Sequence, residues 1–297
     1  MVSAAVSGEL VAERSTIDVR PIHTVKGNVG VGTGNVKFPG SVYVKGAVDS
    51  GYYIFASGDI KVAEAVEACL LSADGDILVK QGVKGAGKAV LRSKGRIQLA
   101  FAAQATLLSV GDIQLKSGCM HSSVKCNGTL RMQSERGSVV GGTVRVRKGL
   151  EAQSLGSSRG VATTVSFGQD YLIADRIEKE EKQIEELKLK ITNMDVTMRE
   201  EAENREKLEE LRKEKKKMLK AIEQRSVRLF TLREKFEEHF PSQIQVRGTI
   251  HPGVTIESHG RTMEFTAPQK GLMISFNEET GRITQAPLKD GGSGGGS

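Results

Sequence analysis

The residues Leu71–Val79 read LSADGDILV, and their pattern recurs along the first half of the chain. In six copies an apolar residue, a mostly small residue, a glycine and two apolar residues follow one another at every second position, and in a seventh copy Ser138 takes the first place. The glycines of the seven copies are Gly40, Gly58, Gly75, Gly95, Gly111, Gly128 and Gly142. Such an internal repeat indicates that each copy is one unit of a stacked array.

The alternation within each copy predicts short β-strands with one buried face. The glycine stands at a constant place in the unit, where the backbone has to bend. A unit of about 17 residues is too short for a hairpin and a helix, and it suits one coil of a parallel β-helix, or solenoid. We expect two buried columns along the stack, the first Val42, Ile60, Ile77, Ile97, Ile113, Leu130 and Val144, the second Ile54, Leu71, Leu91, Leu107 and Val124.

The composition agrees with a narrow solenoid core. Aromatic residues make up 4% of the chain, tryptophan is absent, and 34 of the 297 residues are glycine. No apolar run is long enough for a membrane-spanning helix, and the N-terminus lacks the features of a signal peptide. The three cysteines, Cys69, Cys119 and Cys126, show no disulfide spacing. Unpaired cysteines in strands are small buried residues, and they favour a cytoplasmic location.

The chain divides into five segments by composition. We expect a disordered leader at 1–15, the parallel β-helix at 16–171, a helical region at 172–240, returning strands at 241–288 that complete or cap the β body, and a linker or tag at 289–297.

Two series of heptads characterise the helical region. Ile177, Ile184, Ile191 and Met198 are spaced by seven residues, and a second series begins at Leu208. The polar stretch 199–205 separates the two series and changes their phase. We therefore predict an antiparallel coiled-coil hairpin of two helices of about 28 and 32 residues. The alternative is one unbroken helix that pairs with another chain.

The order of these parts resembles the bacterial flagellar assembly protein A family. The resemblance covers about residues 25–285. It is carried by the coiled coil and by four sequence motifs: TGNV at 33–36 with GSV at 40–42, ASGDIKV at 56–62, ADGDILVKQGV at 73–83, and VRGTIHPGVTI at 246–256. The resemblance implies a right-handed β-helix and a cytoplasmic, non-enzymatic role connected with flagellar assembly or cell-pole organisation. Members usually carry a further N-terminal domain, which we do not find ahead of the repeats.

No motif for catalysis or cofactor binding has the surrounding residues that its chemistry requires. Gly82–Lys88 matches a phosphate-binding loop, but Ala89 replaces the required Ser or Thr and a strand pattern follows. Cys119, His121 and Cys126 are one ligand short of a closed zinc site. Cys126 occupies the small-residue position of its repeat, like Ala73 and Ser109, and this favours packing over metal binding. We therefore predict no enzyme activity, no cofactor and no metal.

The excess of positive charge lies in the repeat region. Residues 16–171 contain 19 Lys and Arg against 11 Asp and Glu, whereas residues 172–240 contain 18 of each. The expected outward positions, which we predict to align as one basic strip, carry Lys45, Lys61, Lys80, Lys116, Arg131, Arg145 and Arg147. Such a strip suits an acidic protein partner. The alternative is that these basic residues contact only water and counterions. Nucleic acid is disfavoured because no base-stacking aromatic residues interleave the strip.

Two functions fit these features. The first is a scaffold or adaptor that presents a rigid basic face and a coiled coil to protein partners. The second is a self-assembling, bactofilin-like cytoskeletal filament, formed when open solenoid ends stack between molecules. Homo-oligomers through the coiled coil or the β-helix ends fit either function. The returning strands and the hairpin would hinder end-to-end stacking, so the scaffold is favoured.

Overall fold

The structure is a computed structural model that describes residues 8–13, 16–201 and 204–288. These residues form two compact units, one made by the segments before Asp170 and after Glu238, the other by Asp170–Glu238. The predicted linker at 289–297 and most of the predicted leader lie outside the described residues. Within the leader, β1 (Glu9–Glu13) pairs antiparallel with β2 (Thr16–Arg20).

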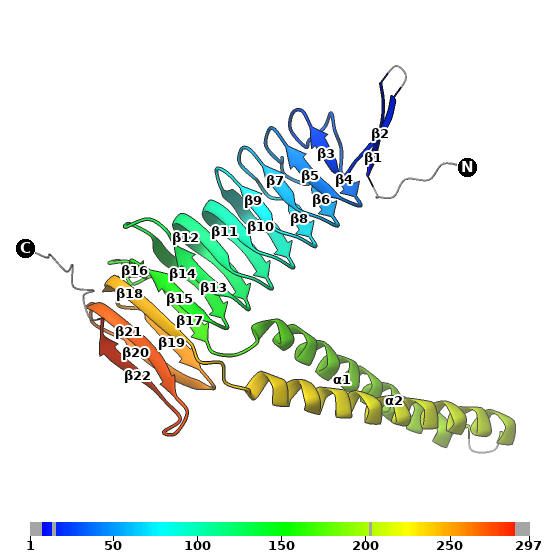
Figure 1. Ribbon diagram of the computed structural model, residues 1–297. Helices are drawn as coiled ribbons and strands as arrows, with labels where there is room; N and C mark the ends of the chain where they lie inside the picture. The colour runs from blue at the N-terminus through cyan, green and yellow to red at the C-terminus, as the bar shows by residue number, and fades with distance from the viewer. Residues whose placement is uncertain (1–7, 14–15, 202–203, 289–297) are drawn as a thin grey trace, which may run out of the picture. The chain divides into compact units, whose positions relative to one another are not determined.

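The first unit is the predicted parallel β-solenoid, in which successive coils stack side by side (Figure 1). Its first sheet contains β3 (Ile22–Val25), β5 (Ser41–Val44), β7 (Ile60–Val62), β9 (Ile77–Val79), β13 (Thr129–Met132), β15 (Gly149–Ala152) and β18 (Gln243–Ile250). Its second sheet contains β4 (Val36–Phe38), β6 (Tyr53–Ala56), β8 (Leu70–Ala73), β14 (Ser138–Val146), β17 (Thr163–Phe167) and β19 (Val254–Ser258). Two longer strands, β11 (Ile97–Ser109) and β12 (Ile113–Cys126), run round a coil and join both sheets, whereas β10 (Val83–Ser93) pairs with β8 in the second sheet and with β11.

The two predicted columns form the core, with one correction. Leu130 pairs with Leu150, and Val144 belongs to the second column, where it pairs with Val124 and Val165. The seventh copy of the repeat was therefore assigned to the wrong glycine. Lys148 occupies the place that follows Gly128, because its amide donates to the Gly128 carbonyl.

A third buried column was not predicted. Isolated β-bridges and strand pairings connect Val29, Val48, Val66, Val83, Ala102, Cys119, Val139, Leu155 and Ile250 in stacking order. Each side chain is at most 1% exposed. The column closes the third side of the coil, and the short β16 (Ser154–Leu155) belongs to it.

The coils differ in length. A short coil brings Ile113 beside Ile97, and a longer one brings Val165 beside Val144. The unit of about 17 residues expected from the sequence therefore varies from coil to coil, because the bends between strands take up different numbers of residues.

The aspartate that follows the repeat glycine explains why GD recurs in the sequence. The Asp59 carboxylate accepts a hydrogen bond from the Asp76 amide at 2.8 Å, and Asp76 accepts one from the Arg96 amide at 2.7 Å. Asp112 accepts from the Thr129 amide in the same way. The backbone amides at this corner of the coil have no partner in a strand, and the aspartate carboxylates of the preceding coil accept their hydrogen bonds. These hydrogen bonds link each coil to the next.

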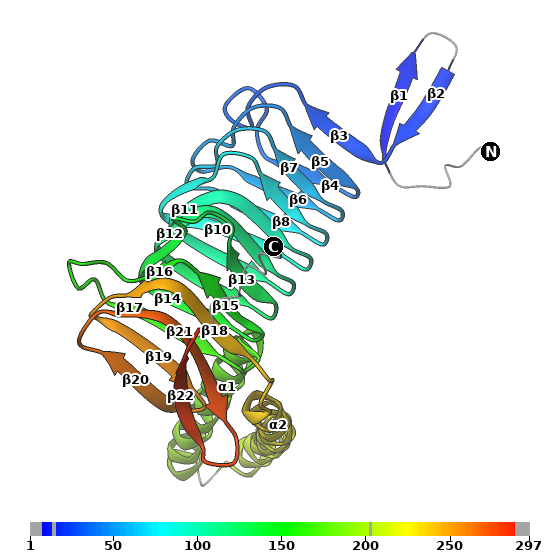
Figure 2. The same ribbon diagram turned by 60° about the vertical axis from the view of Figure 1, so that its left-hand side comes forward.

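The returning strands continue the solenoid and then reverse direction. Strand β18 pairs parallel with β15, and β19 pairs parallel with β17. The last strands, β20 (Arg261–Phe265), β21 (Gln269–Asn277) and β22 (Arg282–Pro287), pair antiparallel beyond them (Figure 2). Ile244 pairs with Leu150, so the first returning strand enters the first sheet, and Gly248 is not at the place of a repeat glycine.

The second unit is an antiparallel helical hairpin of α1 (Tyr171–Glu200) and α2 (Arg205–Glu237), which confirms the hairpin and excludes the unbroken helix. The Asp170 and Asn204 side chains cap the two N-termini by accepting from the amides of Leu172 and Lys207. Ion pairs join the helices along their length, among them Lys215 with Asp195 at 2.5 Å, Arg225 with Glu180 at 2.7 Å, and Arg233 with Glu181 at 2.7 Å.

Candidate interaction surface

The predicted basic residues do not form one strip. Lys45, Lys80 and Lys116 follow strands of the first sheet at equivalent places, since each stands directly after the paired residues Val44, Val79 and Leu115. Ala63 and Ala100 occupy the same place in the coils between them. These three lysines therefore recur at every second coil, about 10 Å apart at the usual strand spacing, and Lys26, which follows Val25, stands beside Lys45 in the adjacent coil.

The other four basic residues lie elsewhere on the coil. Lys61 and Arg131 share a column of the first sheet, but Leu78, Gln98 and Gln114 separate them. The Arg131 guanidinium pairs with the next residue of that column, Glu151, at 3.0 Å. The charge of Arg131 is therefore partly compensated within the solenoid.

Arg145 and Arg147 belong to the second sheet. Arg145 pairs with Lys125, so two cations are neighbours there. The guanidinium carbon of Arg147 lies 5.2 Å from the centre of the Phe240 ring, in a cation–π contact. Arg145 and Arg147 were predicted on the same strip as the lysines because Gly142 was taken for the seventh repeat glycine. In the structure Lys148 occupies that place, so both arginines precede the bend and belong to the second sheet.

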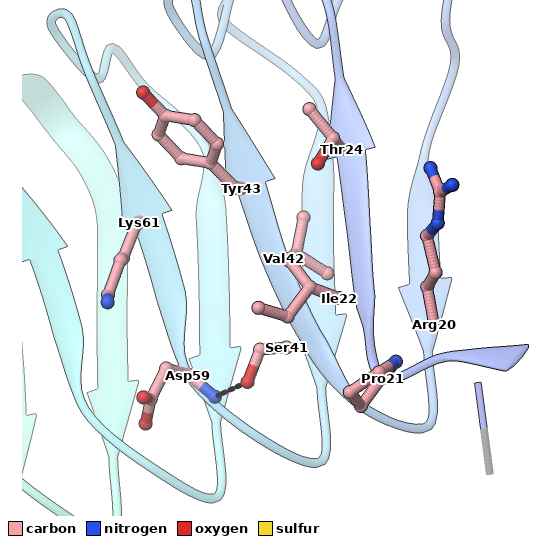
Figure 3. Close-up of a pocket in the computed structure, with 9 residues that line it drawn as sticks. All are labelled: Arg20, Pro21, Ile22, Thr24, Ser41, Val42, Tyr43, Asp59 and Lys61. Atoms are coloured by element: carbon pink, nitrogen blue, oxygen red, sulfur yellow. Dashed lines mark hydrogen bonds between the residues drawn. The ribbon is translucent and has the colours of Figure 1, made fainter. Parts of the chain in front are cut away.

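A groove at the N-terminal coils is the feature that sequence reasoning missed. Its volume is about 580 Å³, and its walls are Arg20, Pro21, Ile22, Thr24, Ser41, Val42, Tyr43, Asp59 and Lys61 (Figure 3). The Ile22 side chain is 50% exposed, and the Ser41 hydroxyl accepts from the Asp59 amide at 3.0 Å. Apolar and basic groups thus lie together over β3, β5 and β7.

A second groove of about 590 Å³ lies on the second sheet of the same coils. It is lined by Lys37, Phe38, Pro39, Phe55, Ala56, Ser57, Ser72 and Asp74. The rings of Tyr53 and Phe55 pack with their centres 4.9 Å apart beside it. The only sequence signal for either groove is the grouping of aromatic residues between Phe38 and Phe55, in a chain otherwise poor in them.

The cysteines and His121 are not brought together as metal ligands. Cys119 faces inward in the third column and Cys126 in the small-residue column, while His121 has a φ of 46° at a corner of the coil. Among the described residues, no group of three or more His, Cys, Asp and Glu is arranged to hold a metal ion. Burial raises the pKa of each of the three cysteine thiols to about 12, so the nucleophilic thiolate is scarce at neutral pH.

The glycine-rich stretch 82–88 has no phosphate-binding geometry. All of it except Gly82 lies in β10, where the pairing with β11 shifts between Lys84 and Ala89. A bulged strand lacks the helix N-terminus that a phosphate-binding loop requires. The stretch is a bend of the solenoid wall.

Comparison with known proteins places the chain in a family. The model of the flagellar assembly protein A (FapA) β-solenoid domain matches residues 21–282. No curated protein and no solved structure gives a significant match. No helix in the described part of the chain is long and apolar enough to cross a membrane. Since the family match spans most of the chain and includes the hairpin and the returning strands, the chain belongs to the flagellar assembly protein A family.

Proposed function

We propose that this protein is a non-enzymatic scaffold that docks protein partners during flagellar assembly. Membership of the FapA family links the chain to flagellar assembly. The observation that supports a docking role is the pair of grooves on the N-terminal coils together with the recurring Lys45, Lys80 and Lys116. The two sheets that carry the grooves are held by strand pairing from coil to coil, so a partner would bind without a folding cost.

The matched family is not a known enzyme family, and the proposed docking role does not require a catalysed reaction. Burial of the thiols supports this role, since it removes the most reactive side chains of the solenoid from the surface. We place the scaffold in the cytoplasm, where free cysteines persist. Acidic proteins are the partners that the lysine column favours.

The proposal is tested by charge reversal in cells. The variant Lys45→Glu/Lys80→Glu/Lys116→Glu changes the column, and Lys84→Glu/Lys88→Glu/Lys148→Glu changes the net charge equally at exposed positions elsewhere. In a strain that lacks the gene, the control should restore swimming and filament number, and the column variant should not. Equal restoration by both variants, at equal protein levels, would contradict the scaffold.

The filament remains the competing function. The antiparallel strands β20–β22 argue against it, because they lie beyond the last parallel coil, where a second molecule would have to stack. Light scattering after size exclusion, across concentration and at two salt levels, separates the two functions. A constant mass supports the scaffold, and a mass that rises with concentration supports the filament.

A further inference from the structure

The helical hairpin has a groove in which positive charge is concentrated. The groove has a volume of about 670 Å³ and lies between α1 and α2. The charged residues that line it are Arg176, Lys179, Glu180, Arg225, Arg228 and Lys235. Five cations therefore face one carboxylate, although residues 172–240 as a whole contain equal numbers of positive and negative side chains. The charge of the hairpin is segregated rather than evenly mixed.

The single carboxylate is used within the hairpin. The Glu180 side chain is 12% exposed, and its two oxygens lie 2.7 Å from Arg225 Nη1 and 3.5 Å from Arg228 Nη1. Arg225 also donates to Gln183 on α1. Glu180 thus fixes Arg225 across the two helices and leaves the other cations of the groove largely uncompensated.

The remaining cations are available to a ligand. Arg228 keeps 67% of its side chain exposed, so its contact with Glu180 is weak. Arg176, Lys179 and Lys235 are exposed, and none of them forms an ion pair with another described residue. Unpaired cations on both walls of a groove attract carboxylates or other anions.

The spacing of these cations favours an elongated ligand. Arg228 and Lys235 are two helical turns apart on α2, which is about 10 Å along a helix, and Arg176 and Lys179 lie on the opposite wall. A single small anion needs donors that converge on one point, whereas these cations are spread along the groove. We propose that the groove binds an acidic segment of a protein partner, with carboxylates that contact both helices. The inference deepens the proposed scaffold function and rests on it.

An anionic lipid surface fits the hairpin less well. Membrane binding by a helix relies on exposed apolar side chains that insert beside the cations. The exposed apolar residues Val227 and Phe230 are on α2, but neither lines the groove. The groove is recessed between two helices, a shape that suits an inserted chain better than a flat surface.

The test measures binding of a fluorescein-labelled deca-glutamate peptide to the full chain by fluorescence anisotropy. Arg228→Glu/Lys235→Glu reverses two cations of the groove. The matched control, Arg212→Glu/Lys220→Glu, reverses two exposed cations of α2 outside it. We expect the groove variant to weaken binding by about tenfold or more, and the control by less than about twofold. Binding by the unchanged chain should also weaken as salt is raised from about 50 to about 300 mM.

A second variant guards against misfolding. Arg228→Glu disturbs the contact with Glu180, so Lys179→Gln/Lys235→Gln removes two charges of the groove without touching that carboxylate. It should retain the helical circular dichroism signal and still lose affinity severalfold. Equal losses in the groove and control variants would overturn the proposal, because binding would then follow net charge alone.

Two further arms identify the occupant. Inorganic tripolyphosphate that displaces the peptide at a far lower concentration than unlabelled peptide would make the groove a phosphate site and overturn the proposal. Sedimentation with phosphatidylglycerol vesicles that is lost in the groove variant, while peptide binding is unchanged, would also overturn it. Groove-dependent peptide binding combined with normal swimming of cells that carry the groove variant would leave the site intact and contradict the flagellar role.

Discussion

At the scale of single residues, the solenoid depends on side chains that accept hydrogen bonds from the next coil. Asp59, Asp76 and Asp112 accept from backbone amides at the corner, and Asn28 accepts from the Ala47 amide in the same manner. An amide oxygen therefore serves this role as well as a carboxylate does. The repeated aspartates of the sequence are structural, and their recurrence does not indicate catalysis or metal binding.

Replacement of Asp76 should separate the hydrogen bond from the charge. Asp76→Ala leaves the Arg96 amide without its acceptor and should lower the free energy of unfolding by about 1–2 kcal/mol. Asp76→Asn keeps an acceptor and should cost less. Burial raises the pKa of Asp76, but hydrogen bonds from the Arg96 amide and side chain and the Arg96 charge outweigh it, so this pKa is lowered from 3.8.

The lowered pKa determines how this contribution depends on pH. The stabilisation by ionised Asp76 is complete above the unfolded-state pKa and is lost as the pH falls through the lower folded-state value. Urea unfolding at pH 7 and pH 3 should show a larger deficit of Asp76→Asn at pH 7. The control Asp74→Asn removes an exposed pair with Lys94 and should change stability by less than about 0.5 kcal/mol. A deficit of Asp76→Asn that does not depend on pH would refute the role of charge.

The cysteines should be inert in the folded protein. Cys69, Cys119 and Cys126 are buried and their pKa values are raised to about 12, so alkylation by iodoacetamide at pH 8 should be slow in buffer. Mass spectrometry should show rapid labelling of all three after addition of urea. Fast labelling without urea would show that the coils open readily.

At the scale of elements, the repeat glycines allow neighbouring coils to approach closely. A Cβ atom at Gly111 would lie 2.7 Å from the Gly95 carbonyl oxygen, and one at Gly95 would meet the Asp76 carboxylate. Gly95 and Gly111 are therefore required by contact between coils, and neither has a φ angle in the left-handed region. A pattern in the sequence reveals the place of these glycines but not this reason for them.

Gly111→Ala should destabilise the solenoid by about 1–3 kcal/mol. The added methyl group would overlap the Gly95 carbonyl oxygen, so the backbone of one of the two neighbouring coils has to shift. The control Gly32→Ala has open space around the added methyl group and should be close to neutral. Thermal unfolding followed by circular dichroism near 218 nm compares the two. Similar melting temperatures would show that the coils yield without cost.

Loss of Glu180 should loosen the hairpin. Glu180→Ala leaves Arg225 beside Gln183 without its carboxylate, and we expect a loss of about 1–3 kcal/mol of hairpin stability. Hydrogen exchange of the amides of α1 and α2 measures the local opening. Glu186→Ala, at an exposed position of α1, is the control and should leave the exchange unchanged.

The sequence predicted elements well wherever one periodic pattern governs them. The heptads located α1 and α2 as two separate helices, because the polar stretch 199–205 interrupts the apolar seam. The third column was missed because its strands shrink to isolated bridges at Val29, Val48 and Val66, so that no alternation marks them. The basic strip failed for two reasons: the positions three and five after a repeat glycine lie in different columns of the first sheet, and Gly142, which was taken for a repeat glycine, precedes residues of the second sheet.

At the scale of the whole molecule, the two ends of the solenoid differ. At the C-terminal end, β20, β21 and β22 pair antiparallel beyond the parallel coils. At the other end, β3 and β4 each pair along one side only, with β5 and β6, within the described residues. Such an asymmetric array can associate through one end without growing into a filament.

Removal of the chain after Ser258 should create a second open end. The exposed edges of β18 and β19 would then invite pairing between molecules, and the mass measured by light scattering should rise with concentration. The complete chain should keep one mass over the same range, and the helical signal at 222 nm checks that the truncated chain retains the hairpin. A constant mass for both proteins would show that β20–β22 have no protective role.

The position of the hairpin in the chain also orders events during synthesis. The coils before it pair residues that are close in sequence, such as Ile97 with Ile113, so each can close soon after it leaves the ribosome. Gly149, by contrast, pairs with Gln243, across the entire hairpin. The last coil therefore waits until both helices have been made, and its closing stretch, with β20–β22, is the final part to be completed. Until that moment a nascent chain exposes the edge of β15, so this edge stays open to aggregation for as long as the ribosome translates α1 and α2.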